Sequence, residues 1–451
     1  DVVLASGTNR FEPTGGAATL TLSGNVTGAG ALLKAAQGLL VLSGTGNTFT
    51  GGLQIGNGKV TVNAGSGLGS GPVVLNPTSN GASGNVTLEL NESVSIGNLS
   101  TSTSGGGSGG RFITIATGKT LAVNETSNST VSADISGGGG FTKAGPATLT
   151  FTGSNTYLGP TTVSEGAVVF SGAKTFPTAG AVTVTNGGGI QFDSNGTYGA
   201  IGQSLALSAT QSATAIVSIT SGATPTFQGD LNLVSGVNRI EANGSTGVLT
   251  LSGNVSGAGT LLKQASGELV LSGSANSATG PTQIGNGKIT VSAGSALGTG
   301  DLTFAQTGVN ATRVDLRNAG QTIGNLATVW SATAQPAPTT TTQRLDLTNG
   351  VVLTINQTGT TTFGDYAGAP ANVTGLGVIT GSGAIVKAGA GSLTLSGSNS
   401  YAGGTTLAAG TLVAGNASAF GTGGITVSGG TLDLGSQAVG NAVTIGGGNL
   451  A

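Results

Sequence analysis

Two stretches of the chain, far apart in sequence, are nearly the same. Residues 20–34 read LTLSGNVTGAGALLK, and residues 249–263 read LTLSGNVSGAGTLLK. Aligned without gaps at an offset of 229, the windows 20–69 and 249–298 are identical at 36 of 50 positions. Shared composition does not place the same residues at the same offset, so this identity indicates duplication of a structural unit.

A more distant copy of the same module lies within each half. GGGGFTKAGPATLTFTGSNTYLGPTTV occupies residues 137–163, and GSGAIVKAGAGSLTLSGSNSYAGGTTL occupies residues 381–407. The layout is therefore A-B-A-B. We place a first unit at residues 1–236 and a second at residues 237–451, each with two repeat modules, in one continuous solenoid.

The modules consist of short stretches with strand character. Residues 19–22, 59–62 and 86–90 alternate apolar and polar side chains with a period of two, which is typical of β-strands. Glycine, at 86 of 451 residues, punctuates them together with Asn and Ser, as tight turns require. No window of 12 residues carries an apolar stripe at helical spacing without a glycine in it. The sequence predicts an all-β protein.

Short strands in tandem fit either a series of β-sandwiches or a solenoid. Aromatic residues make up only 4% of the chain, and slim side chains suit the narrow interior of stacked coils. We therefore favour the solenoid. If each coil takes roughly 20 to 25 residues, the chain forms about 20 coils, which stack into a rod on the order of 100 Å long.

The composition excludes several kinds of chemistry. Cys, His and Met are absent, so disulfides, Cys/His metal sites and imidazole catalysis are excluded. The 14 Lys and Arg and the 16 Asp and Glu are spread singly, without a basic stripe for nucleic acid or an anionic membrane surface. No apolar run is long enough to span a membrane. We expect no cofactor, no metal, no nucleic acid and no membrane insertion of this segment.

The run at residues 381–412 closely resembles the passenger-associated transport repeat of bacterial autotransporters. Residues 138–168 match it well, whereas residues 28–60 and 257–289 match its first half and depart in the second. There the Asn-x-Tyr segment ends in Phe49 in one copy and in Ala278 in the other.

This resemblance implies a right-handed parallel β-helix. It also implies a passenger domain that is secreted through an outer-membrane barrel and displayed outside the cell. Its location would be extracellular, on the bacterial surface or secreted.

Two kinds of charged residue recur in the modules. A lysine follows the glycine-rich start of each module, and we interpret it as a solvated charge at a coil corner; the four are Lys34, Lys143, Lys263 and Lys387. Carboxylates stand between apolar neighbours at Glu89, Asp315, Asp346 and Asp433. Alternation places them toward solvent, and no clustering is evident, so we interpret them as exposed charges and not as a catalytic pair.

Two insertions fall at matching places in the duplicated halves. One covers residues 100–110 and the other residues 327–343. Solenoids send insertions out from their coils, often on a binding side, so we name them as candidate partner-contact loops. The candidate residues are Ser100, Gly105, Gly110, Trp330, Pro336 and Pro338. The Gly-x-Gly-x-x-Gly spacing in the first loop precedes a strand and not a helix, which argues against a nucleotide site.

These observations predict a non-catalytic bacterial surface protein, a β-helical stalk or adhesin. Its partners would be a host-cell, matrix or glycan surface, or copies of itself end to end. Two alternatives stay open: a self-assembling extracellular fibre or sheath subunit, and a polysaccharide-active β-helix enzyme. With so few scattered charges, we expect no ion-pair networks and little change of stability between about pH 5 and 9.

Overall fold

The computed structural model describes residues 1–78, 84–104, 106–171, 179–193, 200–209, 216–293, 297–305, 311–317, 320–329, 343–364 and 377–451. These form two compact units, Asp1–Ala206 and Leu207–Ala451. Each unit contains one A module and one B module of the duplication. The division falls earlier in the chain than the one drawn from the repeats, which ends the first unit at residue 236.

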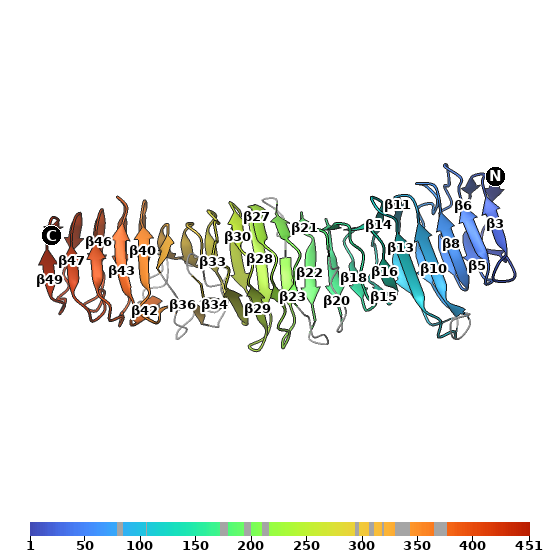
Figure 1. Ribbon diagram of the computed structural model, residues 1–451. Helices are drawn as coiled ribbons and strands as arrows, with labels where there is room; N and C mark the ends of the chain where they lie inside the picture. Colours follow the sequence, from blue (N-terminus) through green and yellow to red (C-terminus); the bar gives the residue numbers. More distant parts are fainter. Residues whose placement is uncertain are drawn as a thin grey trace. The chain divides into compact units, whose positions relative to one another are not determined.

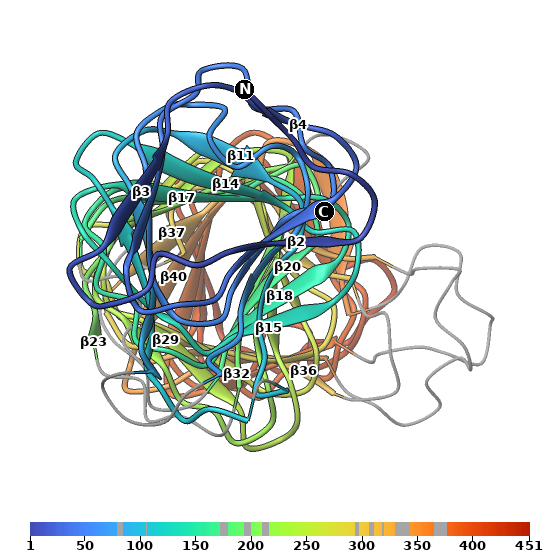
Figure 2. The same cartoon turned by 90° about the vertical axis from the view of Figure 1, so that its right-hand side faces the viewer.

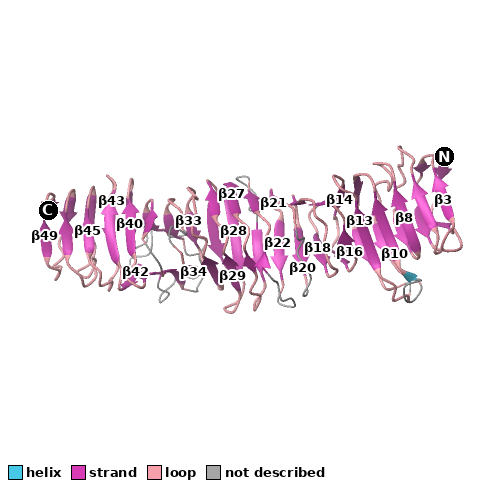
Figure 3. Cartoon of the chain, in the orientation of Figure 1, coloured by secondary structure: helices cyan, strands magenta, loops and turns pink. Residues whose placement is uncertain are grey.

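The described strands pair in parallel throughout, so the chain is a β-solenoid. In the described part of the chain no α-helix forms, and one short helical turn at Gly84 is the exception to strands and loops (Figure 3). The all-β prediction is confirmed. In Figure 1 equivalent strands of successive coils lie side by side within each unit.

The first unit builds its coils from the following strands. One sheet has the order β16 (Asp134–Ser136), β13 (Arg111–Ile115), β10 (Val86–Leu90), β8 (Gly58–Val62), β6 (Leu39–Leu42) and β3 (Thr19–Leu22). A second has the order β12 (Leu99–Thr101), β9 (Val73–Leu75), β7 (Leu53–Ile55), β5 (Ala31–Lys34) and β2 (Thr8–Phe11). Two further runs are β11 (Val94–Ile96), β14 (Thr120–Asn124), β17 (Gly140–Ala144), β19 (Thr161–Val163) and β21 (Val182–Thr185), and β15 (Ser129–Val131), β18 (Thr148–Phe151), β20 (Ala167–Phe170) and β22 (Gly189–Phe192). The remaining strands are β1 (Val2–Val3), β4 (Val26–Thr27), β23 (Ala200–Ile201) and β24 (Leu205–Ser208).

The second unit repeats this construction. One run has the order β26 (Thr226–Phe227), β29 (Val248–Leu251), β32 (Glu268–Leu271), β34 (Gly287–Val291), β36 (Thr312–Leu316), β39 (Gln343–Leu347) and β42 (Gly377–Gly381). Another has β25 (Ile216–Ile219), β28 (Val237–Ala242), β31 (Thr260–Gln264), β33 (Thr282–Ile284), β35 (Leu302–Phe304) and β38 (Leu326–Thr328), and a pair is formed by β27 (Leu231–Ser235) and β30 (Val255–Gly257). The last sheets are β37 (Gln321–Ile323), β40 (Val352–Asn356), β43 (Ala384–Ala388), β45 (Thr405–Leu407), β47 (Ile425–Val427) and β49 (Val443–Ile445), and β41 (Thr360–Phe363), β44 (Ser392–Leu395), β46 (Thr411–Ala414), β48 (Thr431–Asp433) and β50 (Asn449–Leu450).

Each coil turns through several sheet faces. In Figure 2 strands β11, β14 and β17 of the first unit lie together on one side of the coil, and β15, β18 and β20 lie on another. The faces enclose an interior that side chains fill, because residues at alternate positions of the strands are buried.

Duplicated residues pair with the same register in both units. Leu20 pairs with Leu40, and Leu40 pairs in turn with Val60. Leu249 pairs with Leu269 at the same separation. The coil that carries the insertion at residues 327–343 is longer, as the pairing of Val314 with Leu345 shows, and so is the next coil, where Leu345 pairs with Ile379. The solenoid therefore has about 16 turns, fewer than the roughly 20 expected from a uniform coil length.

The core consists of columns of apolar side chains that stack from coil to coil. In the second unit one column is entirely without exposed surface: Leu249, Leu269, Ile289, Val314, Leu345 and Ile379. Aromatic rings stack likewise in the first unit, where Phe151, Phe170 and Phe192 lie in register with ring centroids 5.8 and 5.6 Å apart. Burial of these columns supplies the main stabilisation.

An acidic residue in such a column should unfold the coil. Leu395 in β44 is fully buried and its neighbour Thr394 faces outward. We expect Leu395→Asp to lower the free energy of unfolding by several kcal/mol, because it leaves a cavity and buries a charge. The matched control Thr394→Asp should cost less than about 1 kcal/mol. Urea denaturation measures both, and equal losses would contradict the inward orientation of Leu395.

Candidate functional site

The lysine that recurs in the four modules lies inside the coil. Lys34, Lys143, Lys263 and Lys387 have no exposed surface. The interpretation of these residues as solvated corner charges is therefore wrong. The reason is strand alternation: Lys387 follows the buried Ile385 by two residues in β43, so both side chains point to the interior.

Each lysine binds the backbone of its own turn and of the next coil. The Nζ of Lys387 donates hydrogen bonds to the carbonyl oxygens of Ala388, Gly389 and Ala409, each at 2.9 Å. The other three make the same kind of contact: Lys143 with Ala144, Gly145 and Glu165 at 2.9, 2.7 and 3.1 Å, Lys263 with Gln264, Ala265 and Asn286 at 2.7, 2.7 and 3.3 Å, and Lys34 with Ala36 and with Asn57 at 3.0 Å. An ammonium has three N–H donors, so three carbonyl acceptors satisfy it completely.

Removal from water changes the acidity of these lysines. Burial lowers the pKa of Lys263 to about 7 and the pKa of Lys34 and Lys387 to about 8. Burial also lowers the pKa of Lys143, with Glu125 and Glu165 acting in the opposite direction. The charge is tolerated because the carbonyl dipoles converge on it.

A second buried polar side chain lies in the coil that precedes each B module. Glu125 is fully buried, its Oε1 accepts a hydrogen bond from the Leu99 N–H at 2.9 Å, and burial raises its pKa. Gln357 occupies the equivalent place in the second unit, where its Oε1 accepts from the Leu326 N–H at 3.3 Å. A neutral amide thus replaces the carboxyl group, so the role of the group here is to satisfy a backbone donor.

A buried asparagine joins neighbouring coils in the modules. The Oδ1 of Asn399 accepts from the Ile379 N–H at 2.7 Å, and its Nδ2 donates to the Ala419 carbonyl at 2.6 Å. Asn47 does the same between the Val26 N–H and the Gly67 carbonyl. These amides satisfy backbone groups where the chain turns between strands.

The tyrosine two residues further on is also buried and hydrogen-bonded in the B modules. The hydroxyl of Tyr157 lies 2.7 Å from that of Thr161, and the hydroxyls of Tyr401 and Thr405 lie 2.5 Å apart. In the first A module Phe49 stands in the place of the tyrosine and Leu53 in the place of the threonine. In this module the loss of one hydroxyl is matched by the loss of its partner. The second A module does not follow this rule, because it has Ala278 at the tyrosine position and keeps Thr282 at the threonine position.

Charged residues gather on the outer face of strands β32, β34, β36 and β39. We call this cluster the arginine face; its members are Lys288, Arg313, Arg317 and Arg344 with Glu268, Asp315 and Asp346. Arg317 pairs with Asp315 at 2.9 Å and Lys288 with Glu268 at 3.1 Å, while both Arg313 and Arg344 pair with Asp346. The expectation that this chain forms no ion-pair network is wrong.

The acids of this face correct a second expectation. Alternation places Asp315 and Asp346 on the outer face, but their side chains are only 3% and 1% exposed. The arginines of the same and adjacent coils cover them, so they are not exposed charges. Glu89 is more open and pairs with Lys59 at 2.8 Å, which lowers its pKa. Asp433 is half-buried and accepts from the Gly435 N–H at 2.8 Å.

The recurring lysine, asparagine and tyrosine positions coincide with a known repeat. The sequence profile described as passenger-associated-transport-repeat matches residues 37–65, 141–170, 261–291 and 385–414. The chain carries four passenger-associated-transport-repeats. Four transport repeats on a β-solenoid fit the passenger domain of an autotransporter, which confirms the resemblance seen in the sequence.

Each unit contains two transport repeats, and together the four cover about a quarter of the chain. Three of them include the buried lysine, while the first begins just after Lys34. The repeat family implies a secreted or surface-exposed protein, and solenoid passengers of this kind are typically structural. No curated protein and no solved structure matches the chain.

The candidate partner-contact loops outside the transport repeats are described only in part. Ser100 lies in β12 and is half-buried, and the Gly110 N–H donates to Asn85 Oδ1 at 2.7 Å. The other candidates, Gly105, Trp330, Pro336 and Pro338, lie outside the described residues. A role for these loops in partner contact stays a prediction.

Two further features of the described residues concern binding. No group of three or more His, Cys, Asp or Glu in this part of the chain is placed to hold a metal ion, and no helix there is long and apolar enough to cross a membrane.

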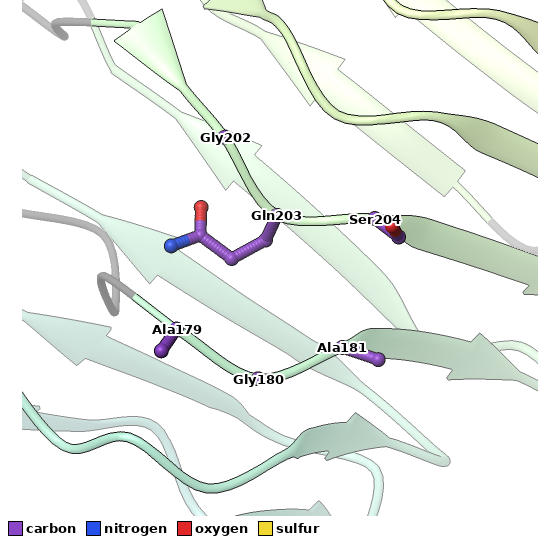
Figure 4. Close-up of a pocket in the computed structure, with 6 residues that line it drawn as sticks. All are labelled: Ala179, Gly180, Ala181, Gly202, Gln203 and Ser204. Carbon is purple, nitrogen blue, oxygen red and sulfur yellow. The ribbon is translucent and has the colours of Figure 1, made fainter.

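A shallow hollow of the first unit is lined by residues 179–181 and 202–204, where the side chain of Gln203 extends between two chain segments (Figure 4). Its other lining residues are Ala, Gly and Ser, so it offers no charged group to a ligand.

Loss of a repeat lysine should destabilise the coil strongly. We expect Lys387→Met to lower the free energy of unfolding by at least about 2 kcal/mol, because three part-buried carbonyls lose the hydrogen bond from the ammonium and, among the described residues, only that of Ala388 keeps the Gln357 N–H as a donor. Lys59→Met is the control, since this lysine is 41% exposed and pairs at the surface, and it should cost less than about 1 kcal/mol. Chemical denaturation compares the two. Equal small losses would contradict a stabilising role for the buried ammonium.

The lowered lysine pKa values replace the expectation of little change between about pH 5 and 9 with a stability that changes above about pH 7. Between about pH 7 and the ordinary lysine pKa of 10.5, the unfolded chain binds more protons than the folded one. The melting temperature should therefore rise with pH across this window. Above about pH 10 the trend should reverse, because burial raises the pKa of Tyr157 and Tyr401 and only the unfolded chain releases their protons there.

Thermal melts from pH 5 to 11 check this expectation. The variant Lys263→Met removes the residue with the lowest lysine pKa and should flatten the rise. A profile that stays level between pH 7 and 10 in the unmodified chain would contradict it.

Proposed function

We propose that this chain is a non-catalytic passenger region displayed outside a bacterial cell, where it acts as a stalk or adhesin. The observation that carries the proposal is the fourfold recurrence of the transport repeat, each copy accompanied by a buried lysine that binds a backbone carbonyl of the following coil. The polar groups of the repeat join one coil to the next, which is the role of a scaffold.

The absence of catalysis is supported by the state of three described carboxylates that stand between apolar neighbours. Asp315 and Asp346 are covered by guanidinium groups, and Glu89 is held by Lys59 and Thr61. A glycosidase needs one free carboxylate and one acid beside the sugar. A host-cell, matrix or glycan surface is the partner that an adhesin of this kind would contact.

Display at the cell surface is tested on intact bacteria that produce the chain. We expect an antibody against it to label unpermeabilised cells, and external protease to remove the label. A periplasmic protein serves as the control for cell integrity. Labelling that appears only after permeabilisation would disprove surface display.

The mode of action is tested on the purified chain. Electron microscopy should show single particles for a stalk or adhesin, whereas long filaments would favour the fibre or sheath subunit.

A screen of polysaccharide substrates should show no turnover. Turnover that disappears in Asp315→Asn or Glu89→Gln would establish an enzyme instead.

A further inference from the structure

The accessible positive charge of the second unit is concentrated on the arginine face. Residues 207–451 contain seven of the chain's 14 basic residues. Two of them, Lys263 and Lys387, are buried inside the coils. Of the five others, Arg239 pairs with Glu241 at 3.1 Å, and the remaining four all belong to the arginine face. Chance scatter of so few charges would not collect them on one sheet.

The cations of this face are exposed and the acids lie beneath them. The side chains of Arg313, Arg317 and Arg344 are 41, 48 and 47% exposed, against 3 and 1% for Asp315 and Asp346. A guanidinium has five N–H donors, and the ion pair of Arg344 with Asp346 is made through its Nε. The buried carboxylates also bind Nε and Nη2 of both Arg313 and Arg317, so they hold these partly exposed guanidinium groups in place and leave the remaining N–H donors for a ligand. Such a fixed guanidinium suits bidentate recognition of carboxylate or sulfate.

The basic residues also form a regular row. Lys288, Arg313 and Arg344 are direct register partners on β34, β36 and β39. Successive strands of a sheet lie about 4.8 Å apart, so the row places one cationic side chain on each of three consecutive coils. Arg317 stands beside it, four residues after Arg313 on the same side of the chain. An extended polymer with one anionic group per building block can follow this row.

Nucleic acid fits the face less well. Phosphates along one strand of duplex DNA rise about 3.4 Å per nucleotide along the helix axis and wind around that axis, so they do not form a straight line that matches this row. The outward residues between the charges are Val270, Thr290 and Thr380, which provide no aromatic ring for a base. Three acids in the cluster also offset three of its four positive charges, so recognition must come from oriented hydrogen bonds.

The duplication supplies an internal comparison. Strand β10 pairs with β8 in the first unit as β36 pairs with β34 in the second, so Thr87 corresponds to Arg313. Two and four residues later, Glu89 corresponds to Asp315 and Asn91 to Arg317. The same coil therefore folds without these two arginines. Their presence in the second unit is a difference added to a shared scaffold.

We propose that the arginine face binds an acidic polysaccharide, one that carries a carboxylate or sulfate on its sugars. The role of such binding in adhesion rests on the surface display proposed above. Binding itself is measured on the purified chain, so a failure of display and a failure of binding are distinguishable.

The test compares the full chain with a variant that carries the residues of the first unit, Arg313→Thr, Asp315→Glu and Arg317→Asn. Polygalacturonate and heparin are the probes, with neutral dextran, duplex DNA and phosphatidylglycerol vesicles as the other arms of a biosensor measurement. We expect the full chain to bind at least one acidic polysaccharide more tightly than dextran, DNA or vesicles. The variant should lose this binding at least tenfold.

Two further variants separate recognition from folding and from general charge. Arg239→Gln removes an exposed cation outside the face and should leave binding unchanged. Arg313→Lys with Arg317→Lys keeps the charge without the bidentate geometry and should weaken binding severalfold. Circular dichroism and melting temperature verify that each variant is folded. The proposal is overturned if the full chain binds neither acidic polysaccharide, prefers DNA or vesicles, or binds equally well after the three substitutions.

Discussion

The parallel backbone ladder is the constraint on which the rest of this protein depends. It sets successive coils one strand spacing apart and aligns each residue with its register partner in the next coil. An inward side chain then packs on its partner above and below, which is why the core is a set of columns such as Leu269, Ile289 and Val314. The same rule stacks the rings of Phe151 and Phe170. Every polar group that enters the interior must also find its partner within one coil spacing.

The sequence was sufficient to predict the architecture, because both the duplication and the two-residue alternation can be recognised without knowing which strands pair. Alternation also indicates that the repeat lysine points inward, since Lys387 stands two residues after the apolar Ile385 in the same strand. The interpretation as a solvated charge is wrong because it gives the preference of an ammonium for water more weight than the alternation. In fact the turn carbonyls that converge on Nζ accept all three of its hydrogen bonds in place of water, although burial still lowers its pKa.

The arginine face could not be predicted in the same way. Asp315 and Asp346 are register partners in successive coils, yet the coils on this sheet differ in length, as the pairs Leu249–Leu269 and Leu345–Ile379 show. The length of each coil decides which residues become register partners, and the sequence pattern does not give that length, so it does not show that Arg313 pairs in register with Arg344. Alternation did place both acids on the outer face. The arginine side chains that bury these acids are brought to them by that register, so the burial is known only from the structure.

The contacts of the repeat lysine have a direction. Its first acceptors belong to its own turn, and the last, such as Glu165 for Lys143 or Ala409 for Lys387, is always contributed by the following coil. A coil therefore leaves an N–H unsatisfied until its C-terminal neighbour docks. The donor always belongs to one coil and the acceptor to the next coil toward the C-terminus. The two ends of a growing stack are therefore chemically unequal. A coil added at the C-terminal end meets a waiting donor, whereas one added at the N-terminal end has to bring its own.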